Sequence, residues 1–173
     1  MEDASKILCI GSVAKDIFFP TAEGIFVDTP EDLTAQRKVM FEVGAKYQIE
    51  DRFEALGGVA ANMSVGLSRL GAQVSCIGVI GDDEIGSWIR SSLAKENVNT
   101  DSLIVLQDAK SDLSSIIVFS EQSDRTIFYN RDSAERLVLS PDYHFPESDW
   151  IVVSALNGAW KENFREILRH VRD

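Results

Sequence analysis

The sequence is most informative about its fold at Gly57-Gly58-Val59-Ala60-Ala61-Asn62-Met63-Ser64, where two glycines precede a run of small residues. Glycine has no Cβ, so a bound molecule can approach the backbone closely at such a site. Asn62 supplies both a donor and an acceptor, which suits a hydroxyl-rich ligand. We therefore expect a helix that begins beside a small polar ligand. By itself, the stretch is equally compatible with a tight turn and a helix packed closely on a sheet.

Strands and helices alternate around this stretch. Apolar runs predict buried strands at 6–11, 74–81 and 150–153. Helices are predicted by apolar residues at helical spacing, over 60–70, after a cap at Asp82 or Asp83, and near the C-terminus, with the apolar positions Met63, Leu67, Leu70, Ile85, Trp88, Ile89, Leu93, Phe164, Ile167, Leu168 and Val171. This alternation is typical of a parallel sheet covered by helices.

Other segments do not fit the alternation and predict a second, small sheet. Residues 13–20 form a strand-like run, 38–53 alternate loosely between apolar and charged residues, and 115–130 predict a hairpin with its turn at 122–124. The polar stretch 21–35 predicts a loop or insertion. We therefore expect an α/β core made of 1–12, 57–113 and 134–173, and a β-sheet lid with an insertion loop made of 13–56 and 114–133.

Composition limits the possible classes of protein. The chain has 173 residues, of which 45% are hydrophobic and 26% charged, and its net charge of −11 repels nucleic acid. No apolar run is long enough to cross a bilayer, so no membrane partner is expected. Residues 1–6 lack the basic start and apolar centre of a signal peptide, which favours a cytoplasmic location.

The pattern at 57–64 continues along the chain. It extends through 66–72, 76–83, Gly86 and 96–100, over nearly fifty residues. This pattern resembles the first signature of the PfkB/ribokinase family of carbohydrate and nucleoside kinases. The resemblance implies an α/β fold, a ribokinase-like three-layer α/β sandwich with a small β-sheet lid.

The resemblance also implies a set of acceptor-binding residues. Asp16, Gly57, Gly58 and Asn62 would hold a small sugar or sugar-like acceptor, since a carboxylate can hold two neighbouring hydroxyls. The alternative for Asp16 is an ordinary solvated carboxylate in a loop. If Gly58 serves the ligand in this way, a valine there should fill the ligand's space and leave the fold intact; loss of the fold would instead indicate a required positive φ.

A fifth candidate is Arg131. Residues 128–134 resemble the Tyr-Arg-x-x-Ser-Ala stretch of the fructokinase and 2-keto-3-deoxygluconate kinase branch, with Asn130 inserted before the arginine. Arg131 could bind a substrate carboxylate or phosphate in bidentate fashion, or it could form a surface ion pair with Asp132 or a neighbouring acid. The sequence leaves both interpretations open.

Several other motifs predict no chemistry. Residues 81–87 have the glycine spacing of a P-loop, but Ser87 stands where the lysine belongs, and a capped helix start explains them better. No Gly-x-Gly-x-x-Gly follows the first strand, which argues against a degenerate nucleotide-binding Rossmann protein. We expect no metal site, assign no role to His144 or His170, and interpret Cys9 and Cys76 as core residues.

The family's second signature, Asp-Thr-x-Gly-Ala-Gly-Asp, has no match in this chain. It would supply the catalytic base and an anion hole, so the resemblance implies a truncated sandwich, with the base beyond Asp173 and the site for ATP and Mg²⁺ mostly outside the chain. The parent protein would transfer the γ-phosphoryl group of ATP to a sugar hydroxyl, while this chain alone would be inactive.

Three further expectations follow. Unpaired edges and uncovered apolar surfaces should make the chain a homodimer, joined through its lid or its exposed sheet edge. A non-catalytic module that binds a small polyol or dimerises is the alternative of a different class. A nucleoside kinase of the same family also remains open.

Overall fold

The computed structural model describes residues 4–49 and 51–172. The predicted features that involve residues 1–3, 50 and 173 lie in part outside the described residues. These include the N-terminal stretch used for the prediction of location.

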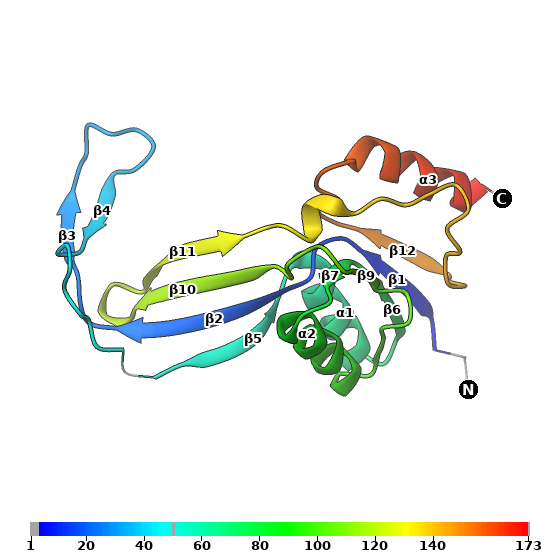
Figure 1. Cartoon of the computed structure of the whole chain (residues 1–173), viewed down its shortest axis with the longest axis horizontal. Coiled ribbons are helices and arrows are strands. Elements are labelled where there is room, and N and C mark those ends of the chain that lie inside the picture. Colours follow the sequence, from blue (N-terminus) through cyan, green and yellow to red (C-terminus); the bar gives the residue numbers. More distant parts are fainter. Residues whose placement is uncertain (1–3, 50, 173) are drawn as a thin grey trace.

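The first sheet is parallel and lies at the centre of the wider end of the molecule (Figure 1). Its strands lie in the order β12-β1-β6-β8, with the bounds Trp150–Val153, Lys6–Ile10, Gln73–Ile77 and Val98–Asn99. Cys9 pairs in register with Val152 on one side and with Cys76 on the other. The sheet thus brings together segments from both ends of the sequence.

Helices cover both faces of this sheet. Cys9 and Cys76 face a cluster that includes residues of α1 (Val59–Arg69) and α2 (Glu84–Lys95). Leu8 and Ile10 point the other way, into a cluster completed by Ile167 of α3 (Trp160–Arg172). Burial on both faces explains why the first strand is an uninterrupted apolar run rather than an alternating one.

The second sheet projects away from the first as a long ribbon (Figure 1). Its order is β11-β10-β2-β5, with the bounds Asp124–Asn130, Leu113–Phe119, Ala14–Thr21 and Phe53–Gly57. β10 pairs parallel to β2, and the other pairs are antiparallel. At its far end stands a hairpin of β3 (Ile25–Asp28) and β4 (Arg37–Met40).

Four short elements of the described chain complete the fold. β7 (Val79–Gly81) pairs with β9 (Ile104–Leu106) as a two-stranded parallel sheet. Two 3₁₀ helices, Ser120–Gln122 and Ala134–Arg136, lie at the tip of the β10–β11 hairpin and after β11.

Most predicted elements are confirmed, including α1, the cap of α2 at Asp83 and the 115–130 hairpin. Three predictions are wrong in whole or in part. The alternating stretch 38–53 is not one strand or hairpin, because only Arg37–Met40 and Phe53–Gly57 find strand partners and residues 41–49 form no strand. The single strand predicted over 74–81 divides at Gly78, where a Cβ would stand 2.9 Å from Val13 Cγ1, and its halves join different sheets. The loop predicted over 21–35 contains β3, because β4 supplies a partner that local sequence does not reveal.

Candidate functional site

A hollow of about 400 Å³ lies where the root of the second sheet meets α1 and the loop after β12. It gathers four of the five predicted binding residues: Asp16, Gly58, Asn62 and Arg131. The remaining lining residues are Ser12, Ala14, Val59, Asp112, Ser114, Ile127, Tyr129, Asn130, Ala155 and Asn157. The predicted residues therefore share one site, although they are scattered over more than a hundred positions.

Asp16 lies inside β2, between Ala55 of β5 and Ser114 of β10. Its half-buried carboxylate accepts no hydrogen bond from any described residue, so it is available to a ligand. Gly57 does not line the hollow. A Cβ at Gly57 would stand 2.5 Å from the Asp16 carboxylate. The first glycine therefore makes room for the protein's own carboxylate.

Gly58 has a structural role that differs from the sequence-based interpretation. Its φ is +84°, and a Cβ would stand 2.7 Å from Val13 Cα and closer still to the Ser12 carbonyl oxygen. That same carbonyl accepts from Ala60 N at 3.1 Å, and Ser12 Oγ accepts from Val59 N at 3.1 Å. The expectation that a valine at Gly58 would spare the fold is wrong, because the space is filled by backbone.

Asn62 lies on the exposed side of the first turns of α1. Its side-chain amide forms no hydrogen bond within the described part of the chain, and it borders the hollow. The N-cap residue Gly58 has no side chain to cap α1, so the amides of Val59 and Ala60 are bound by Ser12. The helix dipole directs partial positive charge toward this end. Both features favour a ligand with acceptor oxygens as well as hydroxyl donors.

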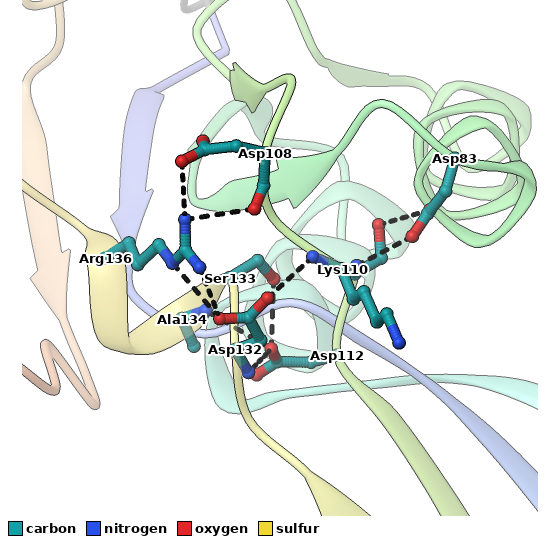
Figure 2. A network of polar contacts seen from close by, with 9 residues as sticks. Asp83, Asp108, Lys110, Asp112, Asp132, Ser133, Ala134 and Arg136 are labelled. Atoms are coloured by element: carbon teal, nitrogen blue, oxygen red, sulfur yellow. Dashed lines mark hydrogen bonds and ion pairs between the residues drawn. The ribbon is translucent and has the colours of Figure 1, made fainter.

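Arg131 does not pair with Asp132. Its guanidinium lies over the Tyr129 ring, 4.5 Å from the ring centroid. Asp132 instead accepts from Lys110 N at 2.8 Å and pairs with Arg136 at 3.0 Å (Figure 2). The predicted ion-pair alternative is thus wrong, and Arg131 forms no salt bridge with any described residue.

Sequence reasoning missed Asp112, a carboxylate that is only 3% exposed. Its Oδ1 accepts from Asp132 N, Ser133 Oγ and Ala134 N at 3.0, 3.0 and 3.2 Å (Figure 2). Burial raises the pKa of Asp112, and these hydrogen bonds act in the opposite direction. An aspartate in a polar stretch before a strand carries no distinguishing signal in sequence, so nothing local could have found it.

The stretch 81–87 is a capped helix start, as the sequence predicts. Asp83 Oδ1 accepts from Gly86 N at 2.7 Å, and Gly81 N donates to Ser111 Oγ at 2.9 Å. Amides that a P-loop would offer to phosphate are already engaged.

Within the described residues no group of three or more His, Cys, Asp or Glu side chains could hold a metal. No described helix has the length and apolarity to cross a membrane.

The two cysteines are buried and free, as the sequence predicts. Burial raises the pKa of Cys76 to about 12 and also raises the pKa of Cys9. Thiolates are the reactive form of cysteine, so neither side chain is a suitable nucleophile at neutral pH.

Known proteins resemble this chain in sequence and in fold. The probable fructokinase-6, chloroplastic, of Arabidopsis thaliana is 28% identical over 144 residues, covering 83% of this chain and 32% of that protein. The 5-dehydro-2-deoxygluconokinase of Photobacterium profundum is 31% identical over 87 residues, which is 50% of this chain and 26% of the relative. The chain thus spans about a quarter to a third of these curated relatives.

Solved structures share the fold. Ribokinase from Cryptococcus neoformans, crystallised with ADP, gives a TM-score of 0.66 at 21% identity, over 95% of this chain and 45% of that one. The nucleoside kinase of Methanocaldococcus jannaschii gives 0.64 at 19% identity, over 87% and 44%. These neighbours confirm the ribokinase-like fold. The model of the pfkB family carbohydrate kinases matches residues 6–170, and the chain therefore belongs to that family.

Proposed function

We propose that this chain is the acceptor-binding part of an ATP-dependent sugar kinase and that the hollow holds the acceptor. The observation that carries the proposal is the convergence of Asp16, Asn62 and Arg131 on one hollow, where no described residue donates a hydrogen bond to the Asp16 carboxylate. A free carboxylate beside a free amide is suited to a molecule with several hydroxyl groups.

The chain's own residues would bind and orient the acceptor. Asp16 would accept hydrogen bonds from two neighbouring hydroxyls, and Asn62 would bind a third oxygen. Tyr129 of β11 and Arg131, which follows β11, also border the hollow, and the Arg131 guanidinium stacks on the Tyr129 ring. In this proposal the second sheet acts as a lid over the acceptor and excludes water, which favours phosphoryl transfer to the sugar over hydrolysis of ATP.

Within the described residues no group of three or more His, Cys, Asp or Glu side chains is arranged to hold a metal ion. ATP would supply the phosphoryl group and Mg²⁺ would offset its charge. We propose that the catalytic base and the nucleotide site belong to other parts of the parent protein. The 173-residue chain by itself should then bind the acceptor without phosphorylating it.

The relatives leave two kinds of acceptor open. Fructokinases take their name from a neutral sugar, whereas a 5-dehydro-2-deoxygluconokinase is named for an acid. The nucleoside kinase shares only the fold, so it carries less weight. We therefore propose a sugar or sugar-like acceptor.

The Asp16→Ala variant tests this proposal. We expect the dissociation constant of D-fructose or D-ribose to rise at least about tenfold, or about 1.4 kcal/mol, because a charge-assisted pair of hydrogen bonds is lost. Isothermal titration of the 173-residue chain measures it. Asp124→Ala is the matched control, since Asp124 lies at the far end of the same sheet and is exposed. Unchanged affinity in Asp16→Ala contradicts the assignment.

Phosphorylation of the same sugars, measured in parallel with ATP, separates a kinase fragment from an unrelated binding module. The proposal is supported if the 173-residue chain binds the acceptor without phosphorylating it and the parent protein phosphorylates the same acceptor. Sugar binding by a parent protein that never phosphorylates any acceptor would favour the non-catalytic module.

We also propose that the chain self-associates through its second sheet or through β12. Large apolar side chains are exposed on both, namely Phe53, Ile127, Phe128, Trp150 and Val153. A second copy of the chain would cover these side chains, and β12 has no described strand on its outer side. Sedimentation equilibrium at low micromolar concentration checks it, and a well-folded monomer that binds no dye specific for exposed apolar surface would rule it out.

A further inference from the structure

We propose that Asp112 is a second acceptor-binding carboxylate, and that together with Asp16 it selects uncharged, hydroxyl-rich acceptors over acceptors that carry a carboxylate. The inference rests on the proposed function, because it assigns a substrate class to the same hollow.

The pairing of β2 with β10 brings the two carboxylates together. Ser114 is the register partner of Asp16, and Asp112 lies two residues before Ser114. The carbonyl of Asp112 accepts from Lys15 N at 3.0 Å, so the extended pairing reaches this residue. Side chains two residues apart on an extended strand point to the same face. Asp112 and Asp16 therefore border the hollow from neighbouring strands.

The hydrogen bonds of Asp112 leave one oxygen free. All three recorded donors converge on Oδ1, and no described residue donates to Oδ2 (Figure 2). Within the described part of the chain this carboxylate forms no ion pair either. Asp112 is more than nine-tenths buried and lines the hollow. Its Oδ2 atom is therefore available to a ligand there.

The backbone clamp does not require a negative charge at this position. An asparagine side chain offers one oxygen in the position of Oδ1, and the hydrogen bonds to Asp112 do not offset the burial of its charge, because its net pKa is raised. A buried ionised carboxylate without a cationic partner opposes folding. The charge of Asp112 is therefore explained by an interaction with a ligand better than by a role in stability.

The charges of the hollow decide the class of ligand. Its charged lining residues are Asp16, Asp112 and Arg131, so two carboxylates stand against one guanidinium and leave one net negative charge. Arg131 is exposed and stacked on Tyr129, where solvent screens it, while Asp112 is buried. A ligand carboxylate would be repelled, whereas hydroxyl donors would find two acceptors.

The test compares the wild-type chain with Asp112→Asn, Asp16→Ala and Asp108→Asn. Asp108→Asn removes a carboxylate from the same polar network, but Asp108 is exposed, pairs with Arg136 and does not line the hollow. D-fructose and D-ribose are the neutral probes, and D-gluconate is the carboxylate probe. Isothermal titration gives the affinities at pH 7.5, and thermal unfolding gives the melting temperatures.

We expect the wild-type chain to prefer the neutral sugars to D-gluconate. Asp112→Asn should weaken binding of the neutral sugars about tenfold, since charge-assisted hydrogen bonds are about twice as strong as neutral ones. Asp112→Asn should also reduce the ratio of the affinity for neutral sugars to the affinity for D-gluconate. Its melting temperature should stay at or above that of the wild type. Asp108→Asn should leave the affinities unchanged.

Each other outcome overturns the inference in a recognisable way. Unchanged sugar affinity in Asp112→Asn, with weakened binding in Asp16→Ala, removes Asp112 and leaves the proposed function standing. D-gluconate bound as tightly as D-fructose by the wild type removes the selectivity. Weaker binding with a lowered melting temperature assigns Asp112 a structural role. Failure of the wild type to bind any of the neutral sugars overturns the inference and the proposed function together.

Discussion

The two four-stranded sheets differ in how their faces are covered. In the first, Leu8, Cys9 and Ile10 are completely buried, because helices pack on both sides. In the second, Phe53 and Ile127 are 53% and 44% exposed. Burial of apolar area is the main stabilising contribution, so the first sheet should carry most of the free energy of folding. The hollow lies where the second sheet, which is partly exposed, meets the helix-covered part of the molecule.

Among the changes considered, Gly58→Val should lower the free energy of unfolding most. A β-branched residue is strained at φ +84°, and its Cβ would clash with the backbone at Ser12 and Val13. We expect a loss of about 4 kcal/mol or more in the free energy of unfolding. Urea unfolding measures it, with Gly66→Ala as the control, since a Cβ at Gly66 meets nothing within 4 Å. The control should gain about 0.5–1 kcal/mol.

A native-like stability of Gly58→Val would mean that the backbone at Ser12 and Val13 moves easily. The backbone would then be less closely packed at the place where the two sheets meet than the buried first sheet indicates.

Matched isoleucines in the two sheets test the contrast more directly. Ile77 of β6 is completely buried, whereas Ile127 of β11 is 44% exposed. Ile77→Ala should cost about 2–5 kcal/mol through lost burial and a cavity, and Ile127→Ala less than about 1 kcal/mol. Chemical denaturation of both variants checks this. Equal costs would show that the second sheet is covered in solution, for example by a second copy of the chain.

The smallest effects concern two aspartates at the junction, which should respond to pH in opposite directions. Burial raises the pKa of Asp83, but hydrogen bonds from Ser111, Gly86 and Ile85 outweigh it, and the net pKa is lowered. Its stabilising contribution is therefore present above its unfolded value of 3.8 and lost as the pH falls through the folded pKa. Asp83→Asn should cost about 1 kcal/mol near pH 7 and less in acid.

The pKa of Asp112 is raised, so its contribution to stability changes with pH in the opposite direction. Its contribution is fully present below 3.8 and is lost as the pH rises through the folded pKa. The charged groups that line the hollow with it are Asp16 and Arg131. Asp112→Asn should therefore be neutral or stabilising near pH 7, with the difference shrinking toward pH 4. Urea unfolding of both variants at the two pH values measures the trends, and parallel trends would contradict this account.

Local patterns in the sequence identify part of the site. Asp16, Asn62 and Arg131 stand in or beside motifs that can be recognised along the chain, and the structure brings them to one hollow. Asp112 and Asn157 belong to no such motif. They reach the hollow because β2 pairs with β10 and because the loop after β12 returns to the end of β1. Pairings between distant segments depend on burial and register, which no local window contains.

The sequence by itself determined the α/β alternation, the helix that follows Gly58, the cap of the second helix and the family, because hydrophobic periodicity, capping and the extended signature are local. Only the tertiary structure decided what the paired glycines accommodate. One leaves space for the Asp16 carboxylate and the other for the Ser12 carbonyl, rather than for a ligand. The role of each glycine depends on which atoms occupy the space where its side chain would lie. Those atoms come from a distant part of the chain, so the local sequence does not identify them.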